Sequence, residues 1–232
     1  MNSASKFDPS RAGEYEAQSR IALAGYEACH ELAACMLSAS LKNRPDARVL
    51  VVGAGGGALE IRTAARLAPA WSFVAVDPSE PMMEIARFRL EEAGLTGRTT
   101  FHAGYVGDLP RDVPFDAATL IGVLHHVPGD AAKHELLTSI AERMRSGAPL
   151  TLAGNRYAYE SRSLLLATWA ERWRLQGAGD EEVRVKLARI RQGAEPPESD
   201  EAVVGLLVDA GFSAPSMFFS SLFWGAWVAT KR

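Results

Sequence analysis

Short apolar runs alternate with amphipathic stretches through the first two thirds of this 232-residue chain. Runs rich in β-branched and aliphatic residues are typical of buried strands, and apolar residues at three- and four-residue steps are typical of helices. The pattern predicts strands at 49–52, 72–76, 99–103, 115–121 and 149–153. It predicts one or two helices at 14–41, and single helices at 57–68, 79–92 and 130–144. This alternation predicts an α/β fold, with a mostly parallel sheet covered on both faces.

The alternation pauses over residues 155–200, which end in the turn-rich segment EPPESD. Three more helices and then two strands are predicted in the remaining chain, at 160–176, 180–192, 201–210, 213–219 and 222–229. Only two or three residues join the last two strands, so they must form a hairpin, and the final strand runs antiparallel to its neighbour. The sequence therefore predicts seven strands, with the last one antiparallel and a helical insertion before the closing elements.

Length and composition predict one soluble domain. A chain of 232 residues with 47% hydrophobic and 23% charged residues suffices for one well-buried core. The net charge of −3 gives no general attraction to nucleic acid or to an anionic membrane. No apolar run approaches a membrane span, and the polar start MNSASKFDPS is not a secretory signal. We expect a cytoplasmic domain over 1–232, with an N-terminal helical cap at 14–41 and a helical lid at 155–200.

The two cysteines carry no evident chemistry. Cys29 and Cys35 lie six residues apart in a predicted helix, which places them on different faces. The spacing supports neither a disulfide nor a pair of metal ligands, and no CxxC or HExxH motif occurs. We expect core cysteines and no metal dependence.

A glycine-rich turn is the strongest functional signal in the chain. The first strand ends in VLVVGAGGG, and the second apolar run, FVAVDPS, ends in Asp77. Glycines allow a tight turn and close approach of a ligand, while a carboxylate can accept hydrogen bonds from both hydroxyls of a ribose. This unit serves nicotinamide or flavin dinucleotides in some proteins and S-adenosylmethionine in others. Residues 53–58 also satisfy the dinucleotide pattern G-x-G-x-x-A.

Three features oppose the dinucleotide interpretation. About 45 residues of helix precede the glycine strand, whereas dinucleotide domains usually begin near it. The closing antiparallel hairpin does not belong to the common dinucleotide-binding strand order. The fourth strand also continues into FDAATLIGVLHHV, a pattern associated with methyl transfer.

These motifs, in this order, resemble class I S-adenosylmethionine-dependent methyltransferases over essentially the whole chain. The resemblance extends to AVDPSEPMM, to HAGYVGDLP and to the closing LLVDAGFSAPSMFF…WGAWVATKR. Within the superfamily, EYEAQSR…GYEACHELA and AGF…FF…GAWVA look closest to the tRNA (cmo5U34)-methyltransferase-like group, which includes carboxy-S-adenosylmethionine synthases. The chain departs from the family where acids are usual, because Val51 and Tyr105 occupy those positions.

The resemblance implies a set of cofactor contacts. They are Tyr26, Gly53, Ala54, Gly55, Asp77, Pro78, Met82, Tyr105, Val106 and Ile121. The glycine turn would lie under the methionine part of the cofactor, Asp77 would hold the ribose, and Tyr105 and Val106 would flank the adenine. Met82 is expected either against the adenine ring or in the core.

His125 and His126 are the candidate catalytic residues. Methyl transfer is an in-line displacement in which alignment dominates and a base removes a proton where the nucleophile needs it. Histidine titrates near neutrality and can serve as that base. The same segment often packs structurally at the end of its strand, so both interpretations stay open.

The helices outside the sheet supply candidate substrate contacts. Tyr15 and Tyr26 match tyrosines that the related group places over its cofactor, although packing of an amphipathic helix explains them as well. Trp169 and Trp173 share one face of a helix, where they either wall a planar substrate or form core. The basic helix at 180–192 also begins with acids, so a solvated surface is expected rather than an RNA-binding face.

We therefore expect a methyltransferase that uses S-adenosyl-L-methionine, acts directly on a small-molecule acceptor and has no nucleic-acid or membrane partner. The resemblance also implies a homodimer, since relatives in the closest group form homodimers. One alternative is a carboxy-S-adenosylmethionine synthase-like enzyme of tRNA modification. An ungapped match places Ala188, with Arg189 beside it, where that group has a carboxylate-reading arginine. The other alternative is a non-catalytic homologue that keeps the fold.

Overall fold

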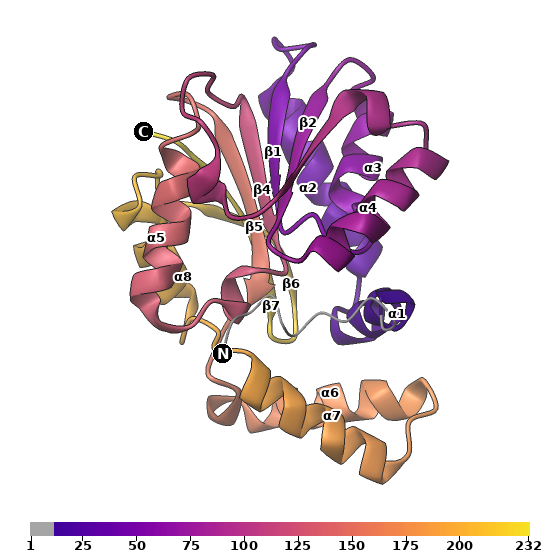
Figure 1. Cartoon of the computed structure of the whole chain (residues 1–232). Helices are drawn as coiled ribbons and strands as arrows, with labels where there is room; N and C mark the ends of the chain where they lie inside the picture. Colours follow the sequence, from indigo (N-terminus) through magenta and orange to yellow (C-terminus); the bar gives the residue numbers. More distant parts are fainter. Residues whose placement is uncertain (1–11) are drawn as a thin grey trace.

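A single twisted sheet forms the centre of the molecule in the computed structural model, which describes residues 12–232 and their side chains from residue 17 onward (Figure 1). Its seven strands have the order β3-β2-β1-β4-β5-β7-β6. Their bounds are β1 Arg48–Val52, β2 Ser72–Asp77, β3 Thr99–Ala103, β4 Ala117–Ile121, β5 Pro149–Asn155, β6 Ser216–Ser221 and β7 Trp224–Thr230. Strands β1 to β5 are parallel, and β7 is antiparallel to both β5 and β6. The predicted fold class is confirmed.

Helices cover both faces of the sheet. The described helices are α1 Ala12–Ala22, α2 Tyr26–Ser40, α3 Leu59–Leu67, α4 Glu80–Glu92, α5 Gly129–Ala141, α6 Ser163–Leu175, α7 Asp180–Gly193 and α8 Asp200–Asp209. Short 3₁₀ turns lie at η3 Thr96–Arg98, η4 Val106–Asp108, η5 Leu124–His126 and η6 Tyr159–Ser161. In the part of the chain that the structure describes, no helix combines the length and the apolar content needed to cross a membrane.

Alternation along each strand divides the core into two layers. Val49 and Val51 of β1 pack with residues of α2, α3 and α4, such as Met83 of α4. Leu50 and Val52 of the same strand pack on the opposite face with residues of α5 and α8. Successive side chains of a strand point to opposite faces, so a continuous apolar run is what a sheet covered on both sides requires.

The structure defines two boundaries more closely than the sequence does. The segment at 14–41, predicted to form one or two helices, forms α1 and α2, which are separated at Gly25 with a left-handed φ of 85°. The fourth strand also begins later than predicted, at Ala117, because Phe115 forms only an isolated bridge to Met144. Elsewhere the predicted and observed elements overlap.

The helical insertion joins the sheet through a hairpin turn. Leu222 and Phe223 link β6 to β7, and the Phe223 side chain is fully buried against Tyr159 and Trp169. The Trp169 indole donates to the carbonyl of Ala22, 2.8 Å away, at the C-terminal end of α1. Carbonyl groups at a helix end lack partners within the helix, so this bond both completes α1 and fastens it to α6.

Candidate cofactor site

The loop after β1 and the end of β2 are joined through Asp77. The amide of Gly55 donates to Oδ2 of Asp77 over 3.0 Å, and the amide of Ser79 donates to Oδ1 over 2.8 Å. Ser79 in turn caps α4 by accepting from the amide of Met82. Two backbone bonds therefore fix the carboxylate, and each oxygen keeps a further acceptor position.

The loop conformation requires glycine at two positions. A Cβ atom added to Gly55 would lie 2.5 Å from Oδ2 of Asp77 and 2.7 Å from Cβ of Met82. Gly53 has a left-handed φ of 76°, and a Cβ there would collide with the Val123 side chain. A side chain at either position would therefore collide with its neighbours, so the turn between β1 and the end of β2 accepts only glycine there.

Substitution of Gly55 by alanine is expected to displace the Asp77 carboxylate. The added methyl group overpacks the turn and should lower the free energy of unfolding by about 1–3 kcal/mol. Gly97→Ala is the matched control, since a Cβ at Gly97 meets nothing within 4 Å. Urea denaturation compares the two variants, and equal stability of both would contradict the close approach.

A pocket of about 410 Å³ opens above this turn. Its floor comes from the carboxyl ends of β1, β2 and β4, where open α/β sheets bind their ligands. The turn after β3 and one side of α5 form the opposite wall. The volume is in the range of small-molecule and cofactor sites.

Burial changes the acidity of Asp77. Removal from water raises the pKa of this carboxyl above 3.8, and the bonds from Ser79 and Gly55 only partly oppose the effect. A carboxylate that is short of water gains more from a hydroxyl donor than an exposed one does. The site is therefore suited to a ligand that brings hydrogen-bond donors to this point.

Most of the predicted cofactor residues come together in the pocket. Those that line it are Gly53, Gly55, Asp77, Pro78, Met82, Tyr105, Val106 and Ile121, together with the candidate base His126. Ala54 is fully buried beneath the turn and is not part of the lining. Tyr26 packs against His30, with ring centroids 4.4 Å apart, on the α2 side. The side chain of Tyr15 lies outside the described residues.

The two histidines have different environments. His126 lines the pocket, with Nδ1 3.3 Å from the carbonyl oxygen of Gly193. His125 is buried, its Nδ1 accepts from the amide of Asn155 over 3.3 Å, and its ring meets Trp224 edge-on at 5.3 Å. Burial holds the pKa of His125 well below 6.5, assisted by the charges of His126 and Lys133. His125 is therefore neutral at pH 7.

The buried His125 is expected to make the fold sensitive to acid. Its pKa is lower in the folded than in the unfolded chain, so protons bind the unfolded chain first as the pH drops below 6.5. The free energy of unfolding should then decrease by up to about 1.4 kcal/mol per pH unit from this residue. Denaturant titrations of His125→Gln between pH 5 and 8 should show a shallower slope. His134→Gln is the control, and an unchanged slope in His125→Gln would contradict the assignment.

Trp169 and Trp173 do not line the pocket. Both are buried, the first against Tyr159 and Phe223, the second beside Val183. The ammonium of Lys186 lies 4.7 Å from the centre of the Trp173 ring. The structure thus places both indoles within the packing of the insertion.

One wall of the pocket was not predicted from the sequence. Ala132, Glu135, Leu136 and Ser139 of α5 face the pocket, one helical turn after another. Their spacing of three and four residues was visible, but the same spacing is expected of any helix that packs on a sheet. Only the position of α5 beside the turn after β3 distinguishes the two cases.

Comparisons with known proteins agree with this geometry. Residues 49–147 match the family described as a methyltransferase domain. No protein of curated function matches the sequence significantly. The matched region begins at the second residue of β1 and holds β2 to β4, the glycine turn and the whole of α5.

Solved structures share the fold at low sequence identity. A candidate O-methyltransferase from Nostoc punctiforme has a TM-score of 0.63 at 17% identity, covering 87% of this chain and 55% of its own. Human N-acetylserotonin methyltransferase, solved with S-adenosylmethionine, has a TM-score of 0.57 at 16% identity, covering 85% and 51%. A candidate sarcosine dimethylglycine methyltransferase from Galdieria sulphuraria has a TM-score of 0.64 at 14% identity, covering 89% and 86%.

The chain thus spans about half the length of the first two of these structures. Identities this low establish the fold alone. Together with the matched domain, they define the Rossmann-like fold of class I methyltransferases, with the pocket at the carboxyl edge of its sheet.

Proposed function

We propose that this protein is an S-adenosylmethionine-dependent methyltransferase that methylates a small-molecule acceptor by direct in-line transfer. The observation that carries the proposal is the Asp77 carboxylate, held by two backbone amides at the edge of an apolar pocket. The matched methyltransferase domain supports it, as do the neighbouring structures, one of which contains S-adenosylmethionine.

The residues present fit this cofactor. Asp77 has the acceptor positions that a ribose diol needs, and Gly53 and Gly55 line the pocket beside it, where the methionine part would lie. Val106 begins the 3₁₀ turn η4, so its amide has no acceptor within the turn. S-adenosylmethionine supplies a methyl group on a sulfonium, which is already a good leaving group.

The chain itself contributes binding, alignment and exclusion of water. Apolar side chains such as Val52, Val76 and Ile121 form the floor and keep the reacting atoms in a medium of low dielectric. Alignment of the acceptor with the methyl group accounts for most of the rate in such a displacement. Where the acceptor must lose a proton, His126 is the histidine at the pocket wall, while His125 lies behind it.

The pocket favours an acceptor without negative charge. Among the described residues that line it there is no lysine or arginine, whereas Asp77 and Glu135 both contribute carboxyl groups. An anionic acceptor would meet no counter-charge there, whereas a neutral acceptor with apolar surface needs none and an amine would find carboxyl groups. Several of the similar structures are named as methyltransferases of small molecules, which is in line with this choice.

Calorimetric titration of the purified protein with S-adenosylmethionine and S-adenosylhomocysteine tests the proposal. We expect both to bind, and we expect product formation when small phenols and amines are screened as acceptors with radiolabelled cofactor. Mass spectrometry of the ligand retained after purification adds a second test. Binding of neither compound would contradict the proposal, as would a retained carboxylated cofactor together with no methyl transfer.

A further inference from the structure

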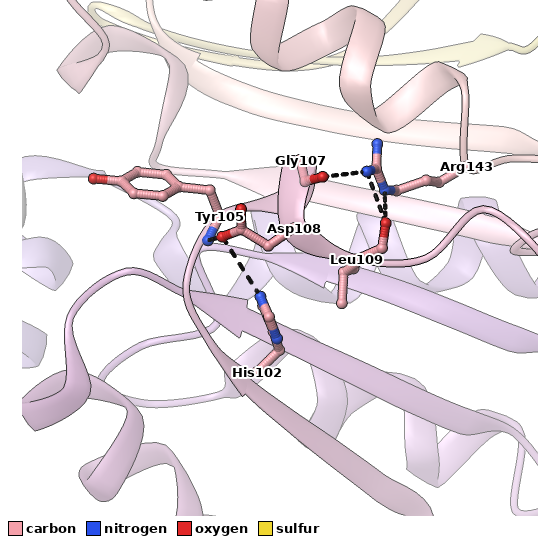
Figure 2. A network of polar contacts seen from close by, with 6 residues as sticks. All are labelled: His102, Tyr105, Gly107, Asp108, Leu109 and Arg143. Atoms are coloured by element: carbon pink, nitrogen blue, oxygen red, sulfur yellow. Dashed lines mark hydrogen bonds and ion pairs between the residues drawn. The ribbon is translucent and has the colours of Figure 1, made fainter.

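The guanidinium of Arg143 is buried just beyond the C-terminal end of α5. The Arg143 residue is 2% exposed, and its hydrogen bonds all go to backbone carbonyl groups. Nε donates to the carbonyl of Leu109 over 3.0 Å, while Nη2 donates to Leu109 over 2.8 Å and to Gly107 over 2.6 Å. Nη1 donates to Ser139 over 2.9 Å, and Figure 2 shows the bonds to Gly107 and Leu109.

A buried cation is stable only when its donors are satisfied. Here the segment after Val106 turns the carbonyls of Gly107 and Leu109 toward one guanidinium, and both carbonyls are needed. The nearby acids are turned elsewhere, since Glu142 pairs with Arg111 at 2.7 Å. Burial and the charge of Arg111 lower the pKa of Arg143, although arginine stays charged at neutral pH. The planar fork of arginine matches this arrangement, and a lysine ammonium does not.

The same segment is held from its other side by Asp108. Oδ2 of Asp108 accepts from the amide of Tyr105 over 2.9 Å and lies 3.9 Å from Nε2 of His102. The ring of Tyr105 points away from Arg143 in Figure 2. A Cβ on Gly104 would lie 2.8 Å from Nε2 of His102, so this side of the segment is closely packed as well.

Val106 and Gly107 lie between these two attachments, and both line the pocket. Arg143 itself does not line it. Resting on the proposed function, we propose that Arg143 is a positioning residue that fixes the Val106–Gly107 wall so that it reads the base of the cofactor. Adenine presents an unprotonated ring nitrogen, N1, to an amide donor such as that of Val106. Hypoxanthine carries a proton on the same nitrogen, so a rigid wall rejects it.

Titration calorimetry with S-adenosylhomocysteine and S-inosylhomocysteine tests this assignment. The wild-type protein is expected to prefer the adenosyl compound. Arg143→Lys should weaken adenosyl binding about tenfold and reduce the preference over the inosyl compound, because the wall can then adjust to either base. Asp108→Ala acts from the exposed side of the segment, so the fold is retained, and it should reduce the preference too. Arg111→Gln is the matched control and should keep both affinities.

Base preference separates positioning from general loss of structure, and thermal melts verify that each variant is folded. If Arg143→Lys and Asp108→Ala both keep the wild-type preference, the assignment is overturned, even when both affinities fall together. A wild-type protein that binds neither compound would overturn the proposed function, and this assignment with it. A wild-type protein that binds both equally would overturn base reading alone.

Discussion

Replacement of Asp77 by asparagine is expected to weaken S-adenosylmethionine binding by about 100-fold or more. The substitution keeps the shape of the side chain but removes its charge, and charge-assisted hydrogen bonds are worth about 1.5–3 kcal/mol each. Asparagine also has one acceptor oxygen, so it cannot accept from both Gly55 and Ser79 as the carboxylate does. Calorimetric titration measures the change.

Asp209→Asn, on the exposed face of α8, is the matched control and should bind as the wild type does. The affinity of the wild type should also decrease on acidification, because protonation removes the acceptor charge of Asp77. Since burial raises the pKa of this carboxyl above 3.8, the decrease begins at a higher pH than for an ordinary aspartate. Wild-type affinity in Asp77→Asn would refute the ribose contact.

Replacement of Trp169 by alanine is expected to lower the free energy of unfolding by about 3–5 kcal/mol. The indole is 1% exposed, and it joins three parts of the chain that are distant in sequence. It packs on Phe223 of the hairpin turn and on Tyr159, and it donates to the carbonyl of Ala22. Its removal leaves a cavity and an unsatisfied carbonyl at once. Urea denaturation measures the loss.

Trp169→Phe separates the two contributions, because it keeps most of the packing and removes the hydrogen bond. We expect a loss of about 1 kcal/mol for it. Cofactor binding by this variant should be unchanged, since Trp169 does not line the pocket. A stable Trp169→Phe protein that had lost methyl transfer would instead place the indole in the substrate site.

The sheet and the glycine turn could be predicted from sequence because their signals are local. Buried parallel strands are continuous apolar runs. The turn after β1 needs glycine at Gly53 and Gly55, because a Cβ atom at either position would collide with neighbouring side chains. The hairpin could be predicted from the short connection between the last two strands, since two residues cannot cross a sheet to form a parallel pair.

The rest of the site depends on distances between elements, which no local pattern encodes. The sequence pattern around Ser139 and Leu136 is the same whether these residues face the sheet or the pocket. The apolar face of α6 was likewise equally suited to binding a substrate and to packing in the core. The break between α1 and α2 rests on the single glycine Gly25, in a segment whose apolar spacing continues on both sides. Arg143 gave no sequence signal, because its acceptors are backbone carbonyls 34 and 36 positions away.

The β6–β7 hairpin determines when this molecule can finish folding. All seven residues of β5 are buried, and β7 covers the edge of β5 that β4 does not. Until β7 has been synthesised, one edge of β5 keeps its backbone groups unpaired, and such edges are where nascent chains aggregate. Chaperone protection during synthesis therefore matters most for the interval between the appearance of Pro149 and that of Thr230.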